Sequence, residues 1–137
     1  MPPLPKHPDQ RRRRNATVPM NQLPAEGRKG RSPAWPISDA TPAEVAAWRS
    51  VWKLPQACVW EAQHLERIVA RYVRRLVESE EPGAGAALCG QVAKLEEALL
   101  LTPDRLKRAH YEIVPAESKS EAKPANNVRR LRAVDVA

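Results

Sequence analysis

Proline limits the fold of this chain more than any other residue. Eight of its 14 prolines lie before residue 38, where they favour extended backbone and interrupt helices. The part that can fold therefore runs from about Thr41 to Val114. A helical unit of that size buries only about 60% of the surface of its unfolded chain. It needs further stabilisation, and oligomerisation is the usual source when disulfides and metals are missing.

The spacing of apolar residues within this central part predicts an all-α fold. Thr41, Pro42 and Glu44 form a helix start of the capping-box type. Thr102 followed by Pro103 forms a second start. No segment alternates between apolar and polar residues as a half-buried strand would. Four helices are expected, over residues 41–53, 56–79, 86–100 and 102–114.

The second and third of these helices are separated by a turn, because Pro82, Gly83 and Gly85 interrupt the helical pattern. From Leu88 to Leu99 the third helix carries apolar residues at the spacing of a coiled-coil seam. It is too short for a free-standing coiled coil. We therefore expect the two helices to pack as an antiparallel helical hairpin.

Positive charge is concentrated at the two ends of the chain. Residues 1–37 carry a net charge of +6, residues 38–114 a net charge of −1, and residues 115–137 a net charge of +2. The chain is therefore expected to have three parts. These are a disordered basic arm over 1–38, a helical oligomerisation body over 39–114 and a flexible C-terminal tail over 115–137.

The basic arm is expected to bind nucleic acid, because a flexible polycation can bind a polyanion without a rigid pocket. The alternative is that it serves as a solubilising tail or an import signal. The arm residues expected to contact nucleic acid are Arg11, Arg12, Arg13, Arg14, Arg28, Lys29 and Arg31.

A second basic surface is expected on the second helix, opposite its apolar stripe. Several arginines on one side of a helix are costly to bury unpaired, so we expect this face to line a nucleic-acid surface or channel. The alternative is a solvated face with Glu61, Glu66 and Glu78 as ion-pair partners. The residues of this face are Arg67, Arg71, Arg74 and Arg75.

Tryptophan supplies much of the large apolar bulk. The side chains of Trp48, Trp52 and Trp60 have more apolar bulk than a hairpin and one short helix can easily cover. These residues are therefore expected at an oligomer interface. Trp35 lies between two prolines near the end of the arm. It could anchor the arm on the body or stack on a base. Anchoring is favoured, because the chain leads straight from this residue into the first helix.

The motifs of catalysis are missing from the sequence. There is no Walker A loop, Gly-rich dinucleotide turn or G-x-S-x-G nucleophile elbow, and the histidines lack zinc-ligand spacing. Cys58 and Cys89 lie in apolar helical stretches, where cysteine is usually a small buried hydrophobe. No apolar run reaches the ~18 residues of a membrane span, and no signal peptide is visible. We expect a reduced, intracellular, non-catalytic protein with no catalytic residues, metal or cofactor and no membrane contact.

Several short motifs follow one another in an order typical of one family. They are Arg11–Asn15, Leu23–Pro36, Trp48–Trp52 with Pro55 and Trp60, Leu101–Leu106, and Tyr111–Glu112. This layout, over roughly residues 5–114, resembles the small terminase subunits of tailed bacteriophages, especially those of actinobacterial hosts.

The resemblance implies a non-catalytic component of a genome-packaging motor in the cytoplasm of the bacterial host. Such subunits assemble into homo-oligomeric rings, recognise double-stranded viral DNA and deliver it to the large terminase subunit. The large subunit holds the ATPase and the nuclease. Many relatives carry a helix-turn-helix near the N-terminus, where this chain has a basic arm instead. The resemblance therefore does not predict insertion of a recognition helix into a major groove.

Two other functions fit the sequence as well. In the first, the chain is an arginine-rich RNA-binding regulator in which Arg11–Asn15 folds onto an RNA stem. In the second, the chain is a structural module whose helices bind a protein partner while the arm only solubilises it. Comparing the affinities for duplex DNA and structured RNA distinguishes the RNA-binding regulator from the packaging component. The oligomeric mass in solution distinguishes the structural module from the packaging component.

Overall fold

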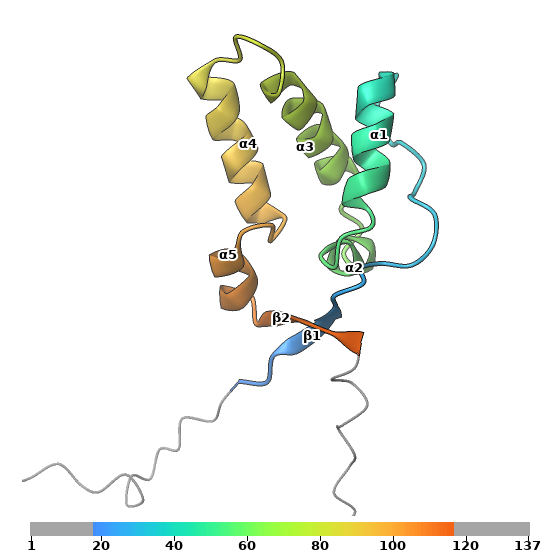
Figure 1. Cartoon of the computed structure of the whole chain (residues 1–137), viewed down its shortest axis with the longest axis vertical. Helices are drawn as coiled ribbons and strands as arrows, with labels where there is room; N and C mark the ends of the chain where they lie inside the picture. Colours follow the sequence, from blue (N-terminus) through green and yellow to red (C-terminus); the bar gives the residue numbers. More distant parts are fainter. Residues whose placement is uncertain (1–17, 117–137) are drawn as a thin grey trace, which may run out of the picture.

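The computed structural model describes residues 18–116 of the chain. This part is mostly helical, with one short two-stranded sheet, so the all-α expectation is corrected by two strands (Figure 1). The elements in chain order are β1 (Asn21–Pro24), α1 (Pro42–Val51), α2 (Ala57–Ala62), α3 (Glu66–Ser79), α4 (Ala86–Ala98), α5 (Pro103–Arg108) and β2 (Tyr111–Val114).

Helices α1, α3 and α4 form the upper part of the molecule in Figure 1, and α3 packs against both of the others. A turn follows α3, and α4 packs beside α3. Helices α2 and α5 and the two strands lie at the other end. Helix α4 occupies nearly the range expected from its apolar spacing, and α3 corresponds to the second part of the helix expected over 56–79.

The start of α1 confirms the predicted capping box. The Glu44 backbone N–H donates to Thr41 Oγ1 at 3.3 Å, and the Thr41 backbone N–H donates to Glu44 Oε2 at 3.3 Å. Pro42 occupies the first turn, where it loses no hydrogen bond. Residues within one turn of each other therefore determine where α1 begins.

The single helix expected over 56–79 is in fact two helices, α2 and α3. His64 has a positive φ of 55°. The backbone N–H of His64 donates to the Glu61 carbonyl at 3.3 Å, and that of Leu65 donates to the Trp60 carbonyl at 2.9 Å. This is the Schellman pattern that ends a helix. The prediction was wrong because the left-handed position holds histidine, where glycine is the usual signal.

The last predicted helix, 102–114, is also shorter than expected. It ends at Arg108, and His110 has a φ of 60°. Residues Tyr111–Val114 form β2, which pairs in parallel with β1 in the register Asn21↔Tyr111. Thr102 is the N-cap of α5 but makes no side-chain cap hydrogen bond. The sequence did not reveal these strands, because each has only four residues and their partners are 90 positions apart.

The core is built around a row of four tryptophans. Trp35, Trp48, Trp52 and Trp60 meet edge to face, with ring centroids 5.1, 5.3 and 5.7 Å apart along the row. Such pairs add about 0.5–1.5 kcal/mol each beyond the burial of their surface. A smaller cluster of Leu23, Val59 and Leu106 holds the strands against α2 and α5. Trp35 thus anchors its segment on the body, as expected.

Residues 18–38 differ from the expectation of a disordered arm. They contain β1, and Gly27 packs so closely that a Cβ atom there would lie 1.7 Å from the Lys53 carbonyl oxygen. Gly27 also has a φ of 83°, which favours glycine. The remainder of the expected arm, residues 1–17, lies outside the described residues, as does the tail from residue 117 onward.

Candidate nucleic-acid interface

The basic residues singled out by the sequence fall into three groups. Arg11, Arg12, Arg13 and Arg14 lie outside the described residues. Arg28 and Arg74 are tied into the fold. The side chains exposed at the surface are Lys29, Arg31, Arg67, Arg71 and Arg75.

Arg28 holds its segment onto α1 and α2. Its Nε and NH2 atoms donate to Glu61 at 3.0 and 2.7 Å, and its NH1 donates to the Arg31 carbonyl at 2.9 Å. The guanidinium also stacks on Trp52, 5.6 Å from the ring centroid. The two hydrogen bonds to Glu61 raise the pKa of Arg28 and lower the pKa of Glu61. Arg28 therefore stabilises the fold by holding the segment after β1 against the helices.

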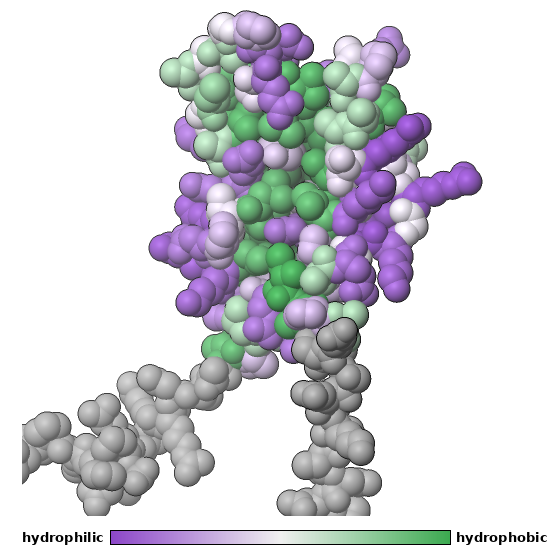
Figure 2. All heavy atoms as spheres, in the orientation of Figure 1, coloured by the Kyte–Doolittle hydropathy of each residue, from purple (hydrophilic) through white to green (hydrophobic). Residues whose placement is uncertain are grey.

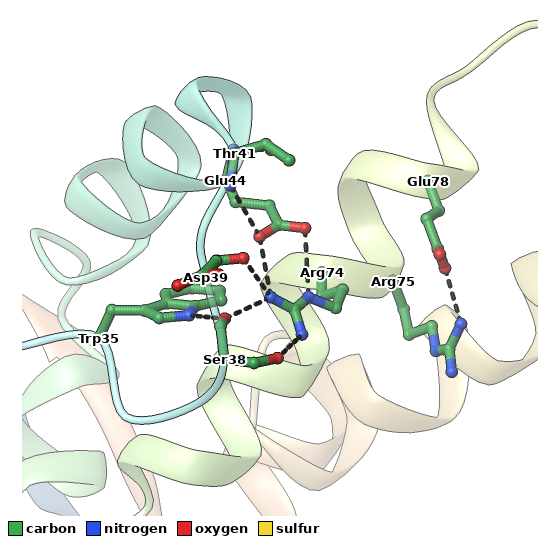
Figure 3. A network of polar contacts seen from close by, with 8 residues as sticks. All are labelled: Trp35, Ser38, Asp39, Thr41, Glu44, Arg74, Arg75 and Glu78. Carbon is green, nitrogen blue, oxygen red and sulfur yellow. Dashed lines mark hydrogen bonds and ion pairs between the residues drawn. The ribbon is translucent and has the colours of Figure 1, made fainter.

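Arg74 is the centre of a second network, between α3 and the segment that precedes α1 (Figure 3). Its NH2 donates to the carbonyls of Ser38 and Asp39 at 2.7 and 3.0 Å. Its Nε donates to Glu44 Oε1 at 3.2 Å, and Glu44 is only 6% exposed. Its guanidinium lies over the ring of Trp35. The expectation that none of the four arginines of this face packs internally is thus wrong for Arg74.

The other arginines of α3 remain at the surface. Arg75 donates to Glu78 at 2.7 Å, with both side chains half exposed, so this pair is worth little. Of the three alternative partners, Glu78 is the one that pairs with an arginine of this face in the described part of the chain. Arg67 and Arg71 make no ion pair with any residue between 18 and 116.

A groove of about 650 Å³ runs between α3 and α4. Its apolar lining comes from Ile37, Ile68 and Leu95. Its basic lining includes Lys94, which the sequence did not single out because only the packing of α4 on α3 brings it beside the arginines. The basic residues that line the groove are Arg71, Arg74, Arg75 and Lys94.

The three tryptophans expected at an oligomer interface lie inside the chain's own core. Trp48, Trp52 and Trp60 are 3%, 1% and 0% exposed. The reason for placing them at an interface therefore does not hold, because the folded chain covers them itself. Figure 2 nevertheless shows hydrophobic side chains gathered along the middle of the face in view, with hydrophilic side chains on both sides.

The described residues offer neither a metal cluster nor a membrane-spanning helix. Within residues 18–116, histidine, cysteine, aspartate and glutamate nowhere gather in groups of three or more that could hold a metal ion. None of the helices in this range has the length and apolar character needed to cross a bilayer. Cys58 is half-buried and Cys89 is exposed, and both are free thiols, so the expectation of burial was wrong for Cys89.

Comparison with known families identifies the chain. A family model described as phage terminase small subunit matches residues 1–135, nearly the whole length. The chain belongs to the phage terminase small subunit family. No curated protein gave a significant match, and neither did any solved structure.

Membership confirms the resemblance drawn from the short motifs. A terminase small subunit takes part in packaging phage DNA inside the infected host cell, and DNA binding and oligomer formation are typical of the family. Arg28 and Arg74 hold the scaffold. The candidate contacts for DNA in this terminase small subunit are the exposed basic residues singled out by the sequence, Lys29, Arg31, Arg67, Arg71 and Arg75.

Proposed function

We propose that this chain is the non-catalytic DNA-recognition component of a phage packaging motor. It binds double-stranded viral DNA, self-associates, and recruits the large terminase subunit, which supplies the ATPase and nuclease. The whole cycle takes place in the host cytoplasm. The match to the terminase small subunit family over residues 1–135 carries this proposal.

Phosphate contacts are assigned first to the N-terminal residues and second to α3. Residues 1–17 contain Lys6 and the run Arg11–Arg14, which gives this segment five basic side chains. On the body, the antiparallel hairpin that we propose for α3 and α4 presents Arg67 and Arg71, which lack ion-pair partners in the described region. Unpaired cations at a surface are the groups that release counterions when they bind phosphates.

Self-association is assigned to surfaces other than the tryptophan row. The band of hydrophobic side chains in Figure 2 and the groove between α3 and α4 both leave apolar surface in contact with water. Apolar surface of this kind marks interaction sites in soluble proteins. A head-to-tail contact that closes on itself would give a ring.

The decisive experiment compares the full chain with a variant that lacks residues 1–17. This boundary leaves β1 and Arg28 in place. Affinity for a duplex DNA and for a structured RNA is measured over a range of salt concentrations. For each phosphate that the variant no longer binds, the log–log salt dependence of duplex binding should flatten by about 0.9. The control replaces Arg67 and Arg71 by glutamine, which should leave folding intact and lower affinity by a smaller step.

Two results would contradict the proposal. Stronger binding to the RNA at matched salt would favour the RNA-binding regulator. No measurable binding to either nucleic acid would favour the purely structural module. If the affinity and the salt dependence are unchanged after the deletion, the arginines of α3, and not the N-terminal residues, make the principal contact with DNA.

A further inference from the structure

A second pocket, separate from the groove on α3, lies at the end of α1. Its volume is about 680 Å³, and every charged residue that lines it is basic. One comes from the last turn of α1, one from the turn that follows this helix and one from the segment after β1. The lining residues are Gly30, Arg31, Ser32, Arg49, Trp52 and Lys53.

The fold builds this pocket from contacts that do not use its three cations. Arg28 fixes the wall by donating to the Arg31 carbonyl while its guanidinium is held by Glu61 and stacks on Trp52. Gly27 lets the segment approach the Lys53 carbonyl, where no side chain would fit. Arg49 lies in the last turn of α1 and Lys53 follows the C-cap residue Trp52, so both lie at the C-terminal end of this helix and line the pocket.

Within residues 18–116, the three cations have no anionic partner. Arg31, Arg49 and Lys53 are exposed, and none makes an ion pair with a residue in the described range. The C-terminal end of α1 favours nearby cations, which accounts for Arg49 and Lys53. It does not account for Arg31, which another segment brings to the same pocket. Like charges gathered in one pocket repel each other, and an anion would relieve that repulsion.

An unsatisfied donor belongs to the same wall. Trp52 is 1% exposed, and among the described residues its Nε1 is the buried side-chain atom without a hydrogen-bond partner. A buried donor left unpaired is costly. The residue that carries this donor is one of those that line the pocket.

We propose that this pocket binds one phosphate group of a nucleic-acid backbone. Arg31 and Arg49 supply planar guanidinium groups that match phosphate oxygens, Lys53 adds a point charge, and Ser32 adds a hydroxyl donor. That the phosphate belongs to DNA rests on the proposed function. The pocket itself requires only a phosphate-type anion. Arg49 and Lys53 thereby join the contact surface, although the charge pattern of the chain did not single them out.

The first test measures duplex binding by the full chain with Arg49→Gln and Lys53→Gln together. Both side chains are exposed, so the variant should fold normally, which circular dichroism checks. The salt dependence should flatten by about 0.9, the value for one fewer bound phosphate. The matched control is Lys107→Gln with Arg108→Gln on α5, which removes the same charge away from the pocket and should leave the slope unchanged.

The second test titrates inorganic pyrophosphate into the full chain and follows the backbone and indole N–H resonances by NMR. Saturable shifts are expected at Arg31, Ser32 and the Trp52 indole. They should disappear in the Arg49→Gln, Lys53→Gln variant and persist in the α5 control. No saturable shift, or a shift equal in all three proteins, would overturn the proposed site.

The two tests keep the site and the function apart. One outcome is that duplex DNA binds with the same salt dependence, and pyrophosphate causes the same shifts, in the full chain and in the Arg49→Gln, Lys53→Gln variant. In that case the pocket is not a phosphate site and the proposed function stands. If pyrophosphate binds in the pocket but no duplex binds, the anion site stands and its assignment to DNA fails.

Discussion

Arg74 connects three parts of the chain through one guanidinium group. It reaches from α3 to the carbonyls of Ser38 and Asp39 and to the buried carboxylate of Glu44 (Figure 3). Glu44 also closes the capping box of α1. Because one side chain satisfies several acceptors at once, its loss leaves more than one polar group unpaired. Arg74 therefore belongs to the scaffold, whereas its neighbour Arg75 is a surface residue.

Replacing Arg74 by glutamine should lower the free energy of unfolding by about 1–3 kcal/mol, because a buried carboxylate loses its ion-pair partner. The lower end of the range reflects the 27% exposure of the arginine side chain. The control is Arg75→Gln, which breaks a half-exposed pair and should cost less than about 0.5 kcal/mol. Urea denaturation measures both. Equal losses in the two variants would contradict the structural role of Arg74.

Gly27 offers a second test of how the segment before α1 is held. Alanine there would place its Cβ atom 1.7 Å from the Lys53 carbonyl oxygen, whereas a Cβ atom at Gly30 meets nothing within 4 Å. Both glycines have a positive φ, so both variants carry similar backbone strain. Gly27→Ala should cost about 1–3 kcal/mol more than Gly30→Ala. Indistinguishable melting temperatures would show that the segment does not pack on α1.

The Arg28–Glu61 contact predicts how stability responds to acid. Hydrogen bonds from Arg28 lower the pKa of Glu61 in the folded chain, so the folded state binds this proton less readily than the unfolded state. The stabilisation is present at neutral pH and is lost as the pH falls through the folded-state pKa. Glu61→Gln should therefore melt below the unmodified chain at pH 7, and the difference should be smaller at about pH 4, within the ordinary range of carboxyl groups. A constant difference at both pH values would contradict this.

At the scale of elements, three helices end in the same unusual way. His64, Leu100 and His110 all have a positive φ and occupy the position just after a helix end. Glycine normally fills that position because side chains resist the left-handed conformation. The sequence therefore carried no stop signal for α2 or α5, and both helices were predicted too long.

The exposed His64 allows this backbone effect to be measured without a change in packing. His64→Val should lower the free energy of unfolding by about 1–2 kcal/mol, because a β-branched residue fits the left-handed region poorly. His64→Gly should be neutral or stabilising by up to about 1 kcal/mol. Thermal melts of the two variants decide the point. A more stable valine variant would mean that α2 and α3 form one continuous helix.

The sequence predicted the elements whose signals are local. The capping box of α1, the apolar stripe of α3 and the turn before α4 all depend on residues within one or two helical turns. It could not predict the pairing of β1 with β2, or the partners of Arg28 and Arg74, because these contacts join residues at least 30 positions apart. Lys29, Arg31, Arg67 and Arg71 are exposed, and their contact with nucleic acid stays a prediction, while Lys53, Arg49 and Lys94 emerged only from packing.

At the scale of the whole molecule, the body has nearly balanced charge but distributes it unevenly. Several of its cations line the groove on α3 and the pocket at the end of α1, while Glu44 and Glu61 each form an ion pair with an arginine. The row of tryptophans stabilises this body from within, which leaves the proposed DNA binding and self-association to its surface. In a phage terminase small subunit of this design, each copy would make several weak phosphate contacts. The assembly would bind DNA through the contacts of all its copies together.

One measurement tests this combination of assembly and DNA binding most directly. The full chain is mixed with a duplex DNA at low salt, and the mass of the complex is determined by light scattering after size exclusion. We predict a single species that contains one duplex and several copies of the 15.3 kDa chain. A folded chain that elutes at 15.3 kDa, apart from the free duplex, would contradict both the assembly and the DNA contact.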